Sequence, residues 1–167
     1  MEEKILADEE LLANLEEVKN RFPGRNYGAM YSSWFGGITT NVALMTVPLD
    51  DHIVHRGDGI FEAFRMVDGA FYNFGAHLER LKHSAAGARM DLPIGIEEIG
   101  KLCRETAKAS GISDAVMRLF ISRGPGGFST NPYDCVGNQI YIAACPFKAP
   151  RAELYSRGAR AGTSSIP

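Results

Sequence analysis

A hairpin pattern near the middle of the chain constrains the fold more than any other feature of the sequence. Residues 59–66 form a run rich in aromatic and apolar side chains, and a second such run covers residues 70–73. Between them lies Val67-Asp68-Gly69. Asp-Gly is a favoured pair in tight turns, because both residues accept a positive φ angle. The sequence therefore predicts two antiparallel strands joined at this turn.

Helices and further strands are expected after the hairpin. One face of a helix over residues 75–89 carries Leu78, Leu81, Ala85 and Ala88. A second helix is predicted over residues 96–109, ending at Ser110-Gly111, because glycine commonly follows the last helical residue. Short apolar runs at 116–121 and 139–144 are typical of buried strands. Strands that come before and after two helices along the sequence predict an α+β domain.

The two ends of the chain differ from this domain. Residues 1–26 are expected to form a helical extension, with leucines at three- to four-residue steps and a stop at Pro23-Gly24. The domain then covers residues 27–147. Apolar periodicity fades over residues 148–167, which we expect to be a connector leading to a further domain.

Composition removes several classes of partner. The formal net charge of -2 and the pI near 6.1 speak against nucleic acid. No apolar run is long enough for a membrane span, and the acidic, amphipathic start is unlike a signal peptide. The cysteines are odd in number and lack C-x-x-C spacing, which favours free thiols in a reducing cytoplasm. They are Cys103, Cys135 and Cys145.

The densest polar cluster covers residues 51–59, just before the first hairpin strand. Asp51, His52 and His55 have a spacing that metal ligands can use. The alternative is that these residues line a turn and bond to the backbone. We favour the turn, and assign no metal. The glycine-rich segment 123–127 lacks the Lys-Ser/Thr of a phosphate-binding loop and precedes no helix, so we expect a mobile loop or turn there.

Two arginines stand in unusual positions. Arg80 precedes the buried Leu81 of the first predicted helix, so it lies on the solvated face or at the edge of the apolar stripe, where its fork of donors could grip a phosphate. Arg118 interrupts an otherwise buried strand, which is costly unless the strand has a solvated face or the side chain faces a cavity. An arginine in such a cavity suits an anionic substrate. We expect both guanidinium groups to turn toward one shared hollow.

Four stretches resemble one known family in order and spacing. They are residues 47–65 (VPLDDHIVHRGDGIFEAFR), 77–85 (HLERLKHSA), 117–127 (MRLFISRGPGG) and 141–146 (YIAACP). Together they are similar to the class IV aminotransferases, which include branched-chain aminotransferases, D-amino acid aminotransferases and 4-amino-4-deoxychorismate lyases. The resemblance implies the small domain of the D-amino acid aminotransferase-like fold, an antiparallel sheet with helices packed on it.

The resemblance also implies roles for individual residues. Arg80 matches the arginine that binds the phosphate of pyridoxal 5'-phosphate (PLP), and Arg118 matches an active-site arginine near the substrate. Phe61 and Phe147 match aromatic walls of the substrate pocket. Arg56 replaces the aromatic residue usual at its position, and we expect it to bind a second carboxylate of the substrate.

Other departures from the family concern substrate and cofactor. Phe128 replaces an arginine common in the lyases, and the segment around Arg56 is closer to plant-type D-amino acid aminotransferases. None of Lys4, Lys19, Lys82, Lys101, Lys108 and Lys148 occupies the place of the lysine that holds PLP. We therefore expect a fragment, inactive alone, whose catalytic lysine lies in a domain beyond the connector.

The resemblance favours amino transfer between an amino acid, branched-chain or D-amino acid, and a 2-oxo acid, with PLP as cofactor and a homodimer as the working form. Two alternatives stay open. One is 4-amino-4-deoxychorismate lyase activity with the same cofactor. The other is a domain without catalysis that serves binding or assembly, should the chain end at Pro167.

Overall fold

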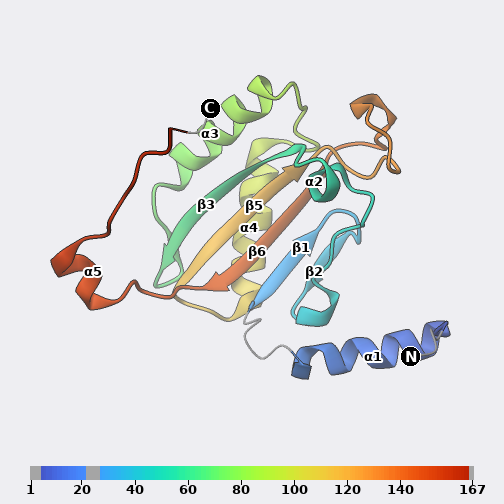
Figure 1. Ribbon diagram of the computed structural model, residues 1–167, viewed down its shortest axis with the longest axis horizontal. Helices are drawn as coiled ribbons and strands as arrows, with labels where there is room; N and C mark the ends of the chain where they lie inside the picture. The colour runs from blue at the N-terminus through green and yellow to red at the C-terminus, as the bar shows by residue number, and fades with distance from the viewer. Residues whose placement is uncertain (1–4, 22–26, 166–167) are drawn as a thin grey trace.

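The computed structural model describes residues 5–21 and 27–165, and contains one antiparallel sheet with helices against one of its faces (Figure 1). The strands are β1 (Ala29–Ser32), β2 (Gly37–Thr39), β3 (Gly59–Val67), β4 (Ala70–Phe71), β5 (Ala115–Ser122) and β6 (Gln139–Pro146), in the spatial order β2-β1-β6-β5-β3-β4. The helices are α1 (Asp8–Arg21), α2 (His52–His55), α3 (Phe74–Gly87), α4 (Ile96–Ser110) and α5 (Ala152–Arg157), with 3-10 turns η1 (Val42–Leu44) and η2 (Pro132–Asp134). The expected α+β class is confirmed.

The predicted hairpin is formed by β3 and β4, paired antiparallel. Its turn residues Asp68 and Gly69 have φ angles of 48° and 76°. Both central residues thus adopt the positive φ that a tight hairpin turn with right-handed strand twist requires. β4 is short, so most of β3 has only β5 as its hydrogen-bonded neighbour.

The two predicted domain helices are also present. α4 ends where Gly111 takes a left-handed φ of 65° and donates its N–H to the Lys108 carbonyl. Its buried side includes Ile99, Cys103 and Ala107, which are spaced one helical turn apart. α4 packs behind β1, β5 and β6, and α3 lies along β3 (Figure 1).

One main core lies between the sheet and these helices. Strand alternation directs every second side chain of β5 and β6 to it, including Met117, Leu119 and Ile142, all fully buried. Leu81 of α3 and Ile99 of α4 cover them. On the opposite sheet face a smaller cluster of Met30, Val42, Met45 and Tyr141 is buried, whereas Phe61 and Arg118 are exposed. That asymmetry positions the site.

The ends of the chain are simpler. α1 begins at Asp8 with an acidic first turn and contacts η1, while its predicted stop at Pro23-Gly24 lies outside the described residues. The expected connector contains the short helix α5, which the sequence pattern did not predict. Within the described ranges, no helix has the length and apolar character that crossing a bilayer demands.

Candidate active site

The sheet face that lacks helices carries three cross-strand rows of side chains. Residues paired across antiparallel strands point to the same face, so β3, β5 and β6 contribute one residue each to a row. The rows are Phe61–Phe120–Tyr141, Ala63–Arg118–Ala143 and Arg65–Val116–Cys145. The middle row places a single guanidinium between two alanines, whose small side chains leave space beside it.

A hollow of about 570 Å³ opens over these rows. It is lined by Tyr27, Met30, Met45, Val47, Ile53, Arg118, Phe120, Tyr141, Ala143 and Cys145. Apolar walls with a few fixed polar groups are typical of small-molecule sites. The hollow suits a molecule with an apolar part and an anionic group that faces Arg118.

Arg118 has a sulfur neighbour in this hollow. The Arg118 guanidinium donates a hydrogen bond to Cys145, which lies diagonally across the strand pair. Burial raises the pKa of the Cys145 thiol, and the charge and hydrogen bond of Arg118 offset only part of that rise. Cys145 therefore remains a neutral thiol at pH 7, and the positive charge of Arg118 is available to a ligand.

Arg80 on α3 makes a two-point contact with Glu62 on β3. Its Nε donates to Glu62 Oε1 at 2.7 Å and its Nη2 to Oε2 at 2.5 Å, while His77 Nδ1 lies 2.8 Å from Oε2. Nη1 is used by neither bond. The Arg80 side chain is 63% exposed, whereas that of Glu62 is 1% exposed. A buried carboxylate thus holds a mostly exposed guanidinium in one orientation.

The charges of this pair are mutually stabilised. Burial raises the pKa of Glu62, but hydrogen bonds and positive charge from Arg80 and His77 outweigh it and leave the pKa below its usual value. The hydrogen bond and charge of Glu62 in turn raise the pKa of Arg80. Both groups are ionised at neutral pH, so Arg80 presents a permanent positive charge to solvent.

The structure does not bring Arg80 and Arg118 into one pocket. Glu62, which holds Arg80, points to the helix-covered face, whereas Arg118 lies opposite Ala63 and points to the other face. Glu62 and Ala63 are consecutive in β3, so the two arginines approach the same stretch of strand from its two faces. The sequence alone cannot show that the two arginines lie on opposite faces, because the orientation of the Arg80 side chain depends on its contact with Glu62.

The remaining expected site residues differ in their surroundings. Phe61 is 62% exposed and lies 6.1 Å from the ring of Phe120, centroid to centroid. Phe147 stacks on the guanidinium of Arg65, whose central carbon is 3.5 Å from the ring centroid. Arg56 follows α2 as its C-terminal cap and is exposed. None of these three lines the hollow around Arg118.

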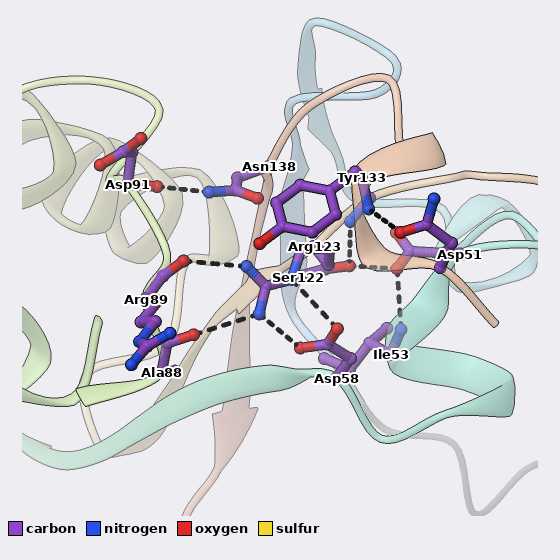
Figure 2. Close-up of polar contacts among 12 residues, drawn as sticks. Asp51, Ile53, Asp58, Ala88, Arg89, Asp91, Ser122, Arg123, Tyr133 and Asn138 are labelled. Carbon is purple, nitrogen blue, oxygen red and sulfur yellow. Dashed lines mark hydrogen bonds and ion pairs between the residues drawn. The ribbon is translucent and has the colours of Figure 1, made fainter. Parts of the chain in front are cut away.

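Asp51 is part of a buried hydrogen-bond network. It caps α2 by accepting a hydrogen bond from the Ile53 N–H at 3.0 Å, and it accepts further bonds from the hydroxyls of Ser122 and Tyr141. Figure 2 shows Asp51 beside the end of β5, with the dashed lines to Ser122 and Ile53. Residues 5–21 and 27–165 contain no group of three or more His, Cys, Asp or Glu side chains that could hold a metal ion. The sequence signal for the capping role of Asp51 is its position directly before a helical turn, where aspartate is a favoured N-terminal cap.

Arg123 fixes the start of the glycine-rich segment. Its guanidinium donates to both carboxylate oxygens of Asp58 at 3.0 Å and to the carbonyls of Ala88 and Arg89 (Figure 2). These bonds join the end of β5 to the segment before β3 and to the end of α3. The next residue, Gly124, has a φ of 97°. The segment is therefore a turn tied to three elements.

The protein family follows from comparison with known sequences. The model of the family "Amino-transferase class IV" matches residues 59–165, well over half of the chain. This chain belongs to the class IV aminotransferases. The match contains the strand with Glu62, the helix with Arg80 and the strand with Arg118.

Individual class IV aminotransferases share both sequence and fold with the chain. A chloroplastic D-amino-acid transaminase from Arabidopsis thaliana is 39% identical over 91% of this chain and 40% of its own length. The branched-chain amino acid aminotransferase of Escherichia coli superposes with a TM-score of 0.66 at 24% identity, over 85% of this chain and 49% of that one. The T.th. branched-chain amino acid aminotransferase, solved with pyridoxamine 5'-phosphate, gives 0.66 at 21% identity, over 77% and 42%. The chain spans about two fifths to a half of the length of these relatives.

Sequence reasoning missed two residues of this class IV aminotransferase domain. Glu62 lies in the quoted stretch 47–65 but has no charge pattern that names its partner, which is 18 residues away on another element. Arg65 is a strand arginine like Arg118. Because burying a charged side chain costs free energy unless it is paired, its position in a strand could have indicated a partner such as Asp114.

Proposed function

We propose that the chain is the small domain of a PLP-dependent aminotransferase, which moves an amino group between an amino acid and a 2-oxo acid. Family membership supports the reaction class. The single observation that carries the proposal is the Arg80–Glu62 contact, because it holds an exposed guanidinium in a fixed orientation while leaving Nη1 unused.

The residues present fit a phosphate-bearing cofactor. Arg80 would hold the phosphate of PLP through charge-assisted hydrogen bonds, and Glu62 and His77 would keep Arg80 oriented. When bound, PLP supplies an electron sink for the charge left on the substrate when its α-proton departs. The solved relative that contains pyridoxamine 5'-phosphate supports this cofactor. We assign the lysine of the family to no residue of this chain.

The chain's other residues bind and orient the substrate. Arg118 would face a carboxylate, and the apolar lining of the hollow would accept an aliphatic or aromatic part and exclude water. Phe61, Phe147 and Arg56 do not line this hollow, so their proposed roles, as aromatic walls and as the binding site of a second carboxylate, apply outside it. D-amino acids and branched-chain amino acids are the proposed substrates, following the printed functions of the relatives.

We also propose a homodimer that works in a reducing compartment such as the cytoplasm. Cys103, Cys135 and Cys145 are all free, which supports the compartment. Light scattering coupled to size-exclusion chromatography would give the mass of the assembly. A monomeric mass at micromolar concentration would refute the dimer.

The cofactor and the reaction are tested with the full-length protein that contains this chain. We expect a visible absorption band with PLP and transfer of amino groups to a 2-oxo acid. Arg80→Gln should weaken PLP binding by about tenfold or more, because one charge-assisted contact to the phosphate is lost. Arg118→Gln is the matched control, expected to raise the KM for the amino acid and leave PLP binding unchanged.

Three outcomes would count against the proposal. A wild-type protein that neither binds PLP nor transfers amino groups would refute the enzyme. Release of pyruvate from 4-amino-4-deoxychorismate without amino transfer would replace the transaminase with a lyase. Unchanged PLP affinity in Arg80→Gln would remove the phosphate role of Arg80.

A further inference from the structure

A second cavity lies on the helix-covered side of the sheet, between the β3–β4 hairpin and the C-terminal half of α4. Its volume is about 590 Å³, and it shares no lining residue with the hollow around Arg118. Its strand residue Met66 points to the helix-covered face, whereas Arg118 points to the other face. The proposed amino transfer therefore does not use this cavity. We call it the hairpin cleft, lined mainly by Met66, Phe71, Phe74, Arg104, Lys108 and Ile112.

The inner surface of the hairpin cleft is apolar and held by the main core. Met66 and Ala107 form its floor and are 1% and 7% exposed. The rings of Phe71 and Phe74 form one wall, with their centroids 4.8 Å apart in a T-shaped contact. Each ring also contacts the buried Phe64, at 5.1 Å and 5.0 Å. These contacts fix the wall in the absence of any ligand.

Backbone hydrogen bonds fix the edges of the cleft. The N–H of Gly69, in the hairpin turn, donates to the Ser113 carbonyl at 3.0 Å, and the N–H of Gly111 donates to the Lys108 carbonyl at 3.2 Å. A Cβ added to Gly69 or Gly111 would meet nothing within 4 Å, so the space at these edges is open. A site whose walls are already ordered loses little conformational entropy when a ligand binds.

Two positive charges stand over the apolar surface. Arg104 and Lys108 are both exposed, line the cleft and lie one helical turn apart on the same face of α4. The Arg104 guanidinium lies 5.9 Å from the ring centroid of Phe74. The lining contains no Asp or Glu, and within residues 5–21 and 27–165 neither cation forms an ion pair. Both charges are therefore available to an anion from outside.

Simpler explanations account for each cation by itself. Lys108 lies in the last turn of α4, where a positive charge interacts favourably with the helix dipole. An exposed arginine on a helix is commonly solvated. Neither explanation accounts for a preformed apolar cleft directly beneath both charges, with the guanidinium of Arg104 directed toward the aromatic wall.

We propose that the hairpin cleft binds a small amphipathic anion, a carboxylate or phosphate ester on an apolar body. The apolar body would pack against Phe71 and Phe74, and the anionic group would accept hydrogen bonds from Arg104 and Lys108. A guanidinium offers paired N–H donors that suit either anion. The volume of the cleft lies in the range usual for small-molecule sites. This inference goes beyond the proposed function and needs neither PLP nor the reaction.

The test uses the full-length protein with 13C-labelled Met and Ile methyl groups, because the two cavities then report separately by NMR. Met66 and Ile112 report on the hairpin cleft, and Met30, Met45 and Ile53 report on the hollow around Arg118. We expect 3-phenylpropionate, phenyl phosphate or both to shift the Met66 and Ile112 signals, with a Kd of about 1 mM. Which probe binds more tightly distinguishes the carboxylate from the phosphate ester. The neutral 3-phenylpropanamide should bind at least about fivefold more weakly, because it lacks the charge.

Variants of α4 and β4 test the two parts of the site. Arg104→Gln and Lys108→Gln should each weaken binding about three- to tenfold. Lys101→Gln is the matched control, since Lys101 is on the same helix, pairs with Glu98 at 3.5 Å and lies outside the lining. Its affinity should stay within about twofold of the wild type. Ala70→Leu, at an exposed lining position, should fill the cleft and abolish binding while both charges remain.

Three results would overturn the inference. They are probe shifts confined to the methyl groups of the hollow, equal affinity for the anions and the amide, and wild-type affinity in both Arg104→Gln and Lys108→Gln. Should one of these two variants fail to fold, the other decides. A wild type without amino transfer refutes the proposed function and leaves this inference standing. An active wild type whose Met66 and Ile112 signals respond to neither anion refutes this inference alone.

Discussion

A buried carboxylate in a strand needs a compensating partner, and Glu62 has two. Arg80 and His77 both come from α3, so the pair Glu62–Arg80 joins a helix to a strand as well as orienting the arginine. The hydrophobic neighbours of Glu62 on β3, Phe64 and Met66, face the same core. A single residue therefore contributes to both the stability and the proposed phosphate site.

The substitution Glu62→Gln tests that contribution. We expect it to lower the free energy of unfolding at pH 7 by about 1–3 kcal/mol, because charge-assisted bonds to Arg80 and His77 are lost. The pKa of Glu62 is lowered in the folded state. Its stabilisation is thus complete above the unfolded pKa of roughly 4.3 and is lost as the pH falls through the folded pKa. Urea unfolding at pH 7 and at lower pH measures both effects.

Glu79→Gln is the control for this experiment. Glu79 is exposed on α3 and pairs with Lys82 at 2.9 Å, an arrangement worth at most about 0.5 kcal/mol. The wild type and Glu79→Gln should lose stability in parallel on acidification, whereas Glu62→Gln should lose less. A variant at Glu62 that follows the wild-type acid curve would show that the carboxylate is not the group responsible.

At the scale of elements, local signals predicted most of the fold. The Asp68-Gly69 turn and the Gly111 cap were correctly predicted, because positions with a positive φ angle strongly favour glycine and, less often, aspartate or asparagine. α5 was missed, since a six-residue helix without buried side chains has no apolar periodicity to detect. α2 was expected as a turn around His52 and His55, and it forms one short helical turn.

The site was less predictable than the elements. Arg80 and Arg118 could be singled out, because each is a charge next to buried positions. The directions in which their side chains point could not be predicted. These depend on strand register and on partners far along the chain, which are Glu62 for Arg80 and Cys145 for Arg118. Sequence patterns report the face of a residue within its own element and carry no information on the neighbouring element.

Glycine substitutions give a graded test of the turns. Gly124→Ala should cost more than about 2 kcal/mol, since its φ is 97° and an added Cβ would meet the Gly137 carbonyl oxygen at 2.0 Å. Gly111→Ala should cost about 1 kcal/mol, because its φ is 65° but the space around it is open. Gly75→Ala, in α3 with ordinary φ and open space, should gain up to about 1 kcal/mol. Thermal unfolding gives the order, and equal losses at Gly124 and Gly111 would contradict the crowding at Gly124.

At the scale of the whole molecule, the sheet separates stability from chemistry. The helix-covered face carries the main core, while the other face carries Arg118 and the hollow. The Asp51 network connects the two roles, since Tyr141 lines the hollow and also donates its hydroxyl to Asp51 at 2.7 Å. Asp51 in turn binds the end of β5 through Ser122 and the start of α2 through Ile53. The network thereby links the Tyr141 wall of the hollow to the start of α2 and the end of β5.

Tyr141→Phe tests this connection through the pH dependence of stability. Burial, together with the hydrogen bond to Asp51 and its negative charge, raises the pKa of Tyr141 above the usual value near 10. A raised folded-state pKa means that the stabilisation is complete below roughly pH 10 and is lost as the pH rises toward the folded pKa. At pH 7 the variant should be less stable by about 1–2 kcal/mol, the contribution of one buried hydrogen bond. The difference in the free energy of unfolding between wild type and variant should narrow above pH 10. There the unfolded wild type gains stability by ionising the Tyr141 hydroxyl, whereas the variant has no hydroxyl at this position. Tyr133→Phe, at a 91% exposed position, should match the wild type throughout. A difference that stays constant to pH 11 would mean that Tyr141 is not held neutral by the buried Asp51, and that packing alone holds its side chain in place.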